Sequence, residues 1–267
     1  MKINFFKMHG AGNDYIFVDE RTFGSVPHPS KVAEIASKHR FSVGSDGLVL
    51  ISEEKGRSCR MRIFNADGSE GMTCGNALRC VGRYLHKNGE GERFTVATCS
   101  GDRVVTVSGD TVTVDMGRAV FRSPDLPPCG IFVMQSESEE FAFTTVSVGN
   151  PHAVAFVSHL NFNVGAVANE LASSGIFPFG VNVEFALPRK LGAEVRVVER
   201  GSGETLSCGS GACAVAAAMK LHGLIDGRAE LHFRGGVLAV DVADDYGLKL
   251  SGSVEKSFEG VVEIDGI

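Results

Sequence analysis

The sequence lacks a long hydrophobic run and an excess of positive charge. Its longest apolar segment, residues 212–219, is far shorter than the roughly 20 residues that a membrane-spanning helix needs. The opening stretch MKINFFKMHGAGND contains polar and charged side chains where a secretion signal would be apolar. A net charge of −6 argues against a surface for nucleic acid or anionic membranes. We therefore expect a cytoplasmic protein that has neither nucleic acid nor a membrane as a partner.

The cysteines also lack the spacing of a metal or disulfide framework. There are seven of them, an odd number, and no C-x-x-C pair occurs. The glycine-rich stretch GSGETLSCGSG has no Lys-Ser or Lys-Thr pair, which a phosphate-binding loop would require. The sequence thus predicts reduced thiols, no metal and no cofactor.

A weak internal repeat is present at a shift of 134 residues, almost half the chain. It aligns residues 61–89 with 195–223, and GNDYIFVD (12–19) matches GNPHAVAFV (149–157) at nearly the same shift. We expect an α+β fold of two pseudo-symmetric domains, each a curved mixed sheet (an open barrel) around a central helix. The N-terminal domain would span 1–117, with a returning segment at about 256–267, and the C-terminal domain 118–255. The identical aligned pairs are Arg62/Arg196, Glu70/Glu204, Cys74/Cys208, Gly75/Gly209, Val81/Val215 and Gly89/Gly223.

Helices are expected at residues 30–39, 75–87, 163–173 and 209–222. Ser30 and Asn163 are the predicted N-caps of the first and third, and Gly89 and Gly223 the stops of the second and fourth. The proline-rich segment 116–130 is the predicted crossover between the halves. The strand-like runs are 3–8, 15–19, 48–52, 59–64, 94–98, 104–107, 112–115, 141–148, 153–157, 181–187, 194–198, 230–233, 238–242, 248–250 and 258–264.

Cys74 and Cys208 each precede one of these central helices. The first N–H groups of a helix have no intrahelical partner and attract anions, so we expect a lowered thiol pKa at both positions. Gly75 and Gly209 leave the backbone open to a ligand. Two related thiols suit inversion of a carbon centre: one removes a proton, and the other delivers one to the opposite face. A redox or peroxide-sensing thiol protein is the alternative from another class.

The sequence resembles the diaminopimelate epimerase family, whose members are cofactor-independent isomerases. The resemblance covers the whole chain in six ordered blocks. These are HGAGNDYIFVD (9–19), GSDGLVL (44–50), NADGSE…CGNALRC (65–80), GNPHAV (149–154), VNVEF (181–185) and ERGSGETLSCGSGACA (199–214).

The resemblance implies epimerisation of LL-diaminopimelate to the meso form, in lysine and cell-wall precursor synthesis, by a homodimer. Cys74 and Cys208 correspond to the catalytic thiols, and His152 and Glu199 to groups that tune their pKa values. Some members have Gln at the position of Gly47. The implied substrate-binding residues are Asn13, Asn65, Gly75, Asn76, Asn150, Asn182, Glu199, Arg200, Gly209 and Ser210.

Simpler interpretations of these residues stay open. His152 could be a buried histidine bonded to a backbone carbonyl, and Glu199 with Arg200 an ordinary surface ion pair. A racemase of another amino acid, such as histidine, on the same scaffold is the close functional alternative, because that substrate would not need Arg200 for a distal carboxylate.

Overall fold

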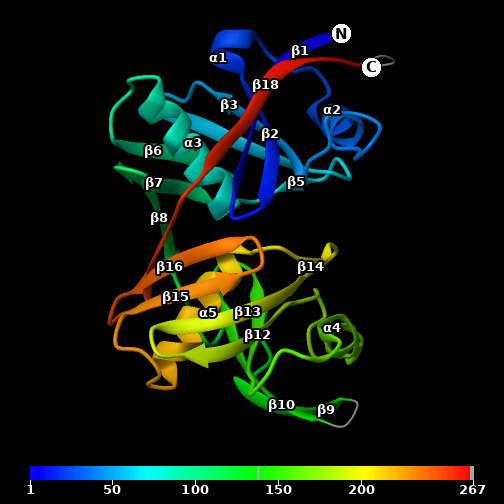
Figure 1. The fold of residues 1–267 in the computed structure, drawn as a ribbon, viewed down its shortest axis with the longest axis vertical. Helices are drawn as coiled ribbons and strands as arrows, with labels where there is room; N and C mark the ends of the chain where they lie inside the picture. Colours follow the sequence, from blue (N-terminus) through cyan, green and yellow to red (C-terminus); the bar gives the residue numbers. More distant parts are fainter. Residues whose placement is uncertain (137–138, 265–267) are drawn as a thin grey trace. The chain divides into compact units, whose positions relative to one another are not determined.

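The same succession of strands occurs twice along the chain. The computed structural model describes residues 1–136 and 139–264. Two compact units are present: unit 1 comprises residues 1–115 and the residues from 252 onward, and unit 2 comprises residues 116–251 (Figure 1). Cys74 lies in unit 1 and Cys208 in unit 2.

Unit 1 is built on a mixed sheet. β1 pairs antiparallel with β2 and with the C-terminal strand β18, and β2 is parallel to β3. β4 is antiparallel to β3 and β5 but parallel to β6, and β7 and β8 follow as antiparallel neighbours. The strands are β1 (Lys2–Gly10), β2 (Asn13–Asp19), β3 (Gly47–Ser52), β4 (Cys59–Asn65), β5 (Glu70–Gly71), β6 (Arg93–Thr98), β7 (Gly101–Ser108), β8 (Thr111–Arg118, which runs on into unit 2) and β18 (Glu255–Glu263).

Unit 2 repeats this pattern from β10 to β17. β11 and β12 are parallel, as β2 and β3 are, and β13 is parallel to β15, as β4 is to β6. β9 pairs with β10 where β18 pairs with β1 in unit 1. The strands are β9 (Ile131–Ser136), β10 (Glu139–Ser147), β11 (Pro151–Phe156), β12 (Asn182–Arg189), β13 (Gly192–Glu199), β14 (Gly203–Thr205), β15 (Arg228–Phe233), β16 (Gly236–Val242) and β17 (Gly247–Gly252).

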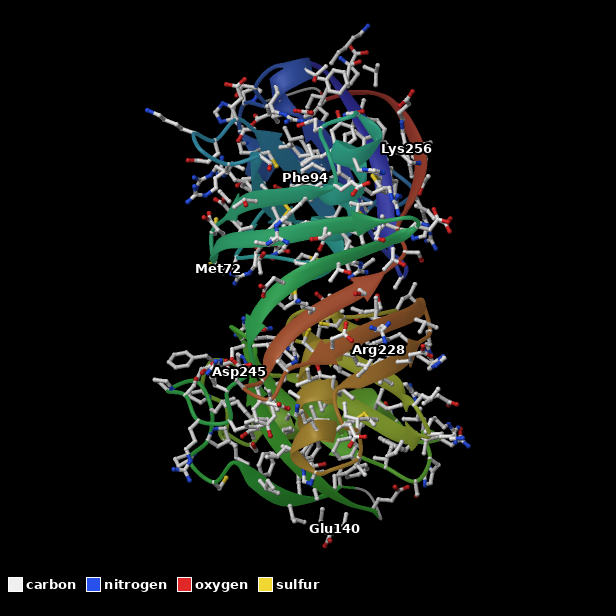
Figure 2. All side chains as sticks on the ribbon, turned by 90° about the vertical axis from the view of Figure 1, so that its left-hand side faces the viewer. Met72, Phe94, Glu140, Arg228, Asp245 and Lys256 are labelled. Carbon is white, nitrogen blue, oxygen red and sulfur yellow. The ribbon has the colours of Figure 1, made fainter. Side chains whose placement is uncertain are left out.

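Each unit encloses one helix within its strands. α3 (Gly75–Lys87) contacts β1, β2, β6 and β7, and α5 (Gly209–Leu221) contacts β10, β11, β12, β15 and β16. Ala212 to Met219 are all buried, as expected for an apolar helix surrounded by a sheet. In unit 1, Phe94 of β6 is 1% exposed and lies in the interior (Figure 2). The α+β class with open mixed sheets around central helices is thus confirmed.

The repeat extends to surface ion pairs. Arg62 on β4 forms a two-pronged salt bridge with Glu70 on β5, and Arg196 on β13 does the same with Glu204 on β14. These four residues are two of the identical pairs at the shift of 134. They link the two strands of the hairpin that leads into each cysteine.

The remaining helices are short and peripheral. They are α1 (Glu20–Phe23), α2 (Pro29–Ala36) and α4 (Val164–Ser173). Asn163 is the N-cap of α4, as predicted, and its Oδ1 accepts a bond from the N–H of Ala166 at 3.1 Å. Gly89 and Gly223 follow α3 and α5 with φ of 79° and 68°, the left-handed conformation expected of a stop.

Several predicted boundaries are wrong. The first helix begins at Pro29 rather than after Ser30, because the ring of proline favours the first helical position, and it ends at Ala36 rather than at residue 39. β8 extends to Arg118, into the predicted crossover. α1, β5, β9 and β14 had not been predicted.

Candidate functional site

In unit 1, Cys74 is the N-cap residue of α3 and lies beside amide side chains. Its Sγ donates to Asn13 Oδ1 at 3.5 Å, and Asn76 Nδ2 donates to the same oxygen at 3.1 Å. Asn76 Oδ1 in turn accepts from Arg79 Nη2 at 2.8 Å. Asn13 is held from its other end, because its Nδ2 donates to Asp46 Oδ2 at 2.6 Å. The thiol of unit 1 is therefore fixed by a chain of amides at the first turn of a helix.

A phenol completes the surroundings of Cys74. Tyr15 is 7% exposed on β2. Burial, followed by the charge of Cys74, raises the pKa of the Tyr15 phenol well above its usual value. Burial also raises the pKa of Asp46, although the backbone N–H of Asp14 bonds to that carboxyl. Neither Tyr15 nor Asp46 had been chosen from the sequence, although both lie within the quoted blocks.

In unit 2, Cys208 is the N-cap residue of α5 and is 5% exposed. Its Sγ accepts a bond from the N–H of Gly211 at 3.3 Å and lies 3.4 Å from Ser210 Oγ. The predicted anion-binding N–H groups of Gly209 and Ser210 belong to the same turn. The second thiol therefore has the helix-start geometry expected from the sequence.

Two glutamates act on Cys208. Glu199, at the end of β13, accepts a bond from Thr205 Oγ1 at 2.6 Å, and burial raises its pKa even though Thr205 and Cys208 bond to it. Burial, and then the charges of Glu199 and Glu184, raises the pKa of the Cys208 thiol well above its usual value, while Ser210 and the N–H of Gly211 lower it. The expectation of a lowered pKa is wrong at this cysteine, because desolvation and two carboxyl groups outweigh the helix dipole.

A fully buried hydrogen bond between a histidine and a glutamate lies next to this group. His152 on β11 and Glu184 on β12 are both 0% exposed, with Nδ1 and Oε1 2.7 Å apart, and His152 Nε2 lies 3.1 Å from Asn150 Oδ1. His152 is therefore bonded to a carboxylate rather than to a backbone carbonyl. Glu184 had not been predicted as a site residue, although an acidic residue in the apolar run VNVEF was a visible signal.

Asn182 and Arg200, which are also predicted site residues of unit 2, form hydrogen bonds with backbone groups. Asn182 Oδ1 accepts from the N–H of Arg200 at 2.9 Å, and Asn182 Nδ2 donates to the carbonyl of Pro151 at 3.3 Å. The exposed guanidinium of Arg200 donates to the carbonyl of Phe179 at 2.7 Å. Glu199 and Arg200 thus bond to different groups and do not form the simple surface pair considered above.

Asn65 and Gly47 in unit 1 are less closely tied to the thiol. Asn65, at the end of β4, is exposed and donates to Ser69 Oγ at 3.0 Å. Gly47 opposes it across the β3–β4 ladder, and a Cβ atom there would lie 2.2 Å from the carbonyl oxygen of Phe64. The backbone of this chain leaves no room for a side chain at position 47.

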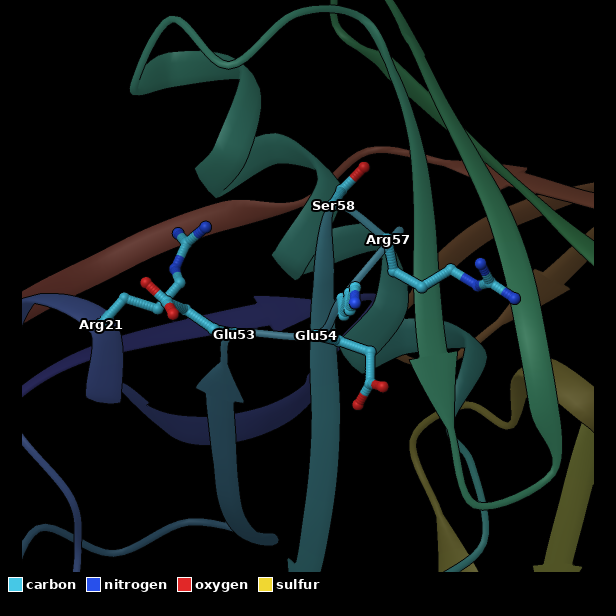
Figure 3. Close-up of a pocket in the computed structure, with 6 residues that line it drawn as sticks. Arg21, Glu53, Glu54, Arg57 and Ser58 are labelled. Atoms are coloured by element: carbon cyan, nitrogen blue, oxygen red, sulfur yellow. The ribbon is translucent and has the colours of Figure 1, made fainter.

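A hollow on the surface of unit 1 lies apart from these groups, at the β3–β4 connection (Figure 3). Its charged side chains have surface partners: Arg57 pairs with Asp102 and Arg21 with Glu90. We assign it no chemistry. Its lining residues are Arg21, Glu53, Glu54, Lys55, Arg57 and Ser58.

A family model described as diaminopimelate epimerase matches residues 5–122 and 144–256. The chain belongs to this family. It is 40% identical over 272 residues to the diaminopimelate epimerase of Bacteroides thetaiotaomicron, with 98% of each chain covered. It is 37% identical over 281 residues to that of Acetivibrio thermocellus, which covers 98% of this chain and 99% of the relative.

Solved structures of other epimerases share the fold of this chain. A hydroxyproline epimerase from Agrobacterium vitis superposes with a TM-score of 0.73 at 15% identity, over 99% of this chain and 93% of that one. A predicted epimerase from Pseudomonas aeruginosa gives 0.71 at 18% identity, over 99% and 100%. Within the described residues, no helix is long and apolar enough to cross a membrane.

Proposed function

We propose that this chain interconverts the LL and meso forms of diaminopimelate by transferring a proton at Cα between Cys74 and Cys208. Membership of the diaminopimelate epimerase family makes the chain an isomerase of amino acids, and lysine biosynthesis follows from that role. The observation that supports the mechanism is the recurrence of a cysteine at the N-cap of the central helix in both units.

The chemistry needs one thiolate and one thiol. The thiolate accepts the Cα proton, and the electron pair of the broken C–H bond remains on the substrate as a carbanion. The second thiol then donates its proton to the opposite face, which inverts the centre and leaves a thiolate behind. Proton transfer of this kind contributes about 10²–10⁴ in rate, so the carbanion needs further stabilisation.

The N-terminal ends of α3 and α5 are suited to stabilise the carbanion. We assign the substrate carboxylate to the N–H groups of Gly75, Asn76, Gly209 and Ser210, where N-terminal helix dipoles favour negative charge as it develops. Asn13, Asn65, Asn150, Asn182, Glu199 and Arg200 would bind the polar groups of the substrate, with the Arg200 guanidinium gripping the distal carboxylate.

Isotope uptake tests the reaction. The protein is incubated in D₂O with LL-diaminopimelate or with histidine, and deuterium at Cα is measured by mass spectrometry. We expect uptake with diaminopimelate only; uptake with histidine alone would instead assign the chain to the racemase alternative.

Cysteine variants test the mechanism. Cys74→Ala and Cys208→Ala should each lose inversion while keeping the wild-type unfolding temperature. Cys213→Ala is the matched control, since Cys213 lies buried within α5, five residues after Cys208. Full inversion by either Cys74→Ala or Cys208→Ala would refute the two-thiol mechanism.

We also propose that the enzyme acts in the cytoplasm as a homodimer. Both statements follow from the family resemblance. Sedimentation equilibrium tests the second directly: a mass of one chain at micromolar concentration would refute it.

A further inference from the structure

Glu184 is a buried carboxylate for which the mechanism above has no role. It lies on β12 in an apolar run and is 0% exposed. Its Oε1 bonds to His152, but its buried Oε2 has no hydrogen-bond partner among the residues that the structure describes. Leaving a carboxylate oxygen buried and unpaired is costly, so such groups are uncommon unless they serve a purpose other than stability.

The fold itself does not require an acid at this position. Glu184 opposes Val154 in the parallel β11–β12 ladder and Val197 in the antiparallel β12–β13 ladder. In unit 1 the same place in the same ladders is taken by Val49, which is fully buried. An aliphatic side chain therefore fills this position of the sheet in one half of the molecule.

The first turn of α5 is adapted to the acid. A Cβ atom on Gly211 would lie 2.6 Å from Glu184 Oε1 and 3.2 Å from Cys208 Cβ. At the shift of 134 residues, Gly211 corresponds to Ala77 in α3. Unit 1 thus combines a valine in the sheet (Val49) with an alanine on the helix (Ala77). Unit 2 combines a glutamate in the sheet with a glycine on the helix.

This arrangement brings the Glu184 carboxylate close to the Cys208 thiol. The largest effects of charge on Cys208 come from Glu199 on β13 and then Glu184 on β12, and His152 on β11 acts on Glu199. The Ser210 hydroxyl and the N–H of Gly211 oppose the two acids. A negative charge on Glu184 therefore makes loss of the Cys208 proton less favourable.

We propose that Glu184 is a positioning residue that orients His152 and keeps Cys208 in its thiol form, so that Cys208 is the proton donor of the resting enzyme. This inference rests on the proposed epimerase function. When the Cys208 S–H bond breaks and the new Cα–H bond forms, the electron pair stays on sulfur. The thiolate so formed lies beside an acid and is a strong base, ready to take a proton in the reverse direction.

The test is the pH dependence of Cys208 alkylation in the substrate-free protein. Iodoacetamide labelling is followed by peptide-resolved mass spectrometry, which separates Cys208 from the other six cysteines. Because two nearby like charges in a buried site repel each other, Glu184→Gln should lower the alkylation midpoint by roughly one to two pH units. Glu184→Asp retains the charge and should keep the midpoint near that of the wild type.

Glu194→Gln is the matched control. Glu194 is paired with Arg189 and lies on β13, five residues before Glu199, about 16 Å along the strand. This variant removes the same charge and should leave the midpoint unchanged. A folded Glu184→Gln protein with the wild-type midpoint would overturn the proposal, and so would a wild-type midpoint below about 8.5, the value of a free thiol. If Glu184→Gln does not fold, comparing the wild-type alkylation midpoint with the pKa of a free thiol still decides between the two outcomes.

Turnover gives a second and separate readout. Glu184→Gln should lower kcat with KM unchanged and shift the pH profile of kcat/KM to lower pH, because Glu184 is enclosed and does not bind substrate. A wild-type pH profile in this variant would also contradict the proposal. Failure of the wild type to take up deuterium would refute the proposed function alone, since the alkylation midpoint needs no substrate.

Discussion

The fit between Gly211 and Glu184 makes a quantitative prediction about a single methyl group. Gly211→Ala places a Cβ 2.6 Å from Glu184 Oε1, which is well inside van der Waals contact. Glu184 cannot move away, because it is enclosed and bonded to His152. Overpacking of this kind costs about 1–3 kcal/mol, and replacing a helical glycine by alanine returns about 1 kcal/mol. We expect a net loss of up to about 2 kcal/mol.

Gly165→Ala is the matched control. Gly165 is the second residue of α4, and an added Cβ would lie no closer than 3.5 Å to its nearest neighbour, Asn163 Oδ1. Here only the helix propensity changes, so stability should rise by about 0.4–1 kcal/mol. With a Tm change of about 2–4 °C per kcal/mol, Gly211→Ala should melt below the wild type and Gly165→Ala above it.

The double variant Glu184→Val/Gly211→Ala reproduces the Val49 and Ala77 of unit 1. Because the methyl group no longer meets a carboxylate, the double variant should be at least about 1 kcal/mol more stable than the sum of the single changes. Differential scanning calorimetry of the four proteins measures this coupling. In Gly211→Ala we also expect kcat to fall by about 10²-fold, since the N–H that bonds to Cys208 is displaced. Strict additivity, or a Tm increase equal to that of Gly165→Ala, would refute the reasoning.

Three further changes should alter stability in directions that urea unfolding can measure. Ala11 has φ 53°, so Ala11→Asn should add about 0.5–1 kcal/mol, because Asn tolerates the left-handed conformation; a lower urea midpoint would contradict this. Gly47→Ala should cost about 1–3 kcal/mol, because its Cβ would strike the carbonyl of Phe64; wild-type stability would show that the strand can shift. The pKa of Glu199 is raised in the folded protein, so its contribution to stability is present below about pH 4.5 and is lost as the pH rises through the folded value. Glu199→Gln should remove that part of the pH dependence above about pH 4.5, and an unchanged slope would argue against it.

Features set by neighbours in the sequence could be predicted from it. The N-cap of α4 and the stops after α3 and α5 depend on hydrogen bonds and φ angles within a few residues, and all three are confirmed. The start of α2 is also set locally, by Pro29 at the first helical position rather than by Ser30 as N-cap. By contrast, β5 and β14 are two and three residues long and exist only because the chain folds back on β4 and β13.

The candidate site shows the same division. Cys74 and Cys208 could be placed at helix starts, since a Cys-Gly pair before a helix is a local pattern. The raised pKa of Cys208 could not be predicted, because its causes, Glu199 and Glu184, come from two other strands. The roles assigned to the amides and to Arg200 remain predictions.

A difference between the pKa values of the two thiols would favour a reaction that needs one thiol and one thiolate at the same time. Two thiols with equal, independent pKa values can hold a single proton between them in at most about half of the molecules, at a pH equal to that pKa. Separating the two values lets nearly every molecule carry one proton, always on the same sulfur, over the pH range between them. The backbone repeat gives both cysteines a helix start, but the positions of Glu184 and Glu199 are occupied by Val49 and Asn65 in unit 1. Glu184 and Glu199 act on Cys208 from positions that unit 1 fills with an apolar and an amide side chain, so the repeat of the backbone does not make the surroundings of the two thiols the same.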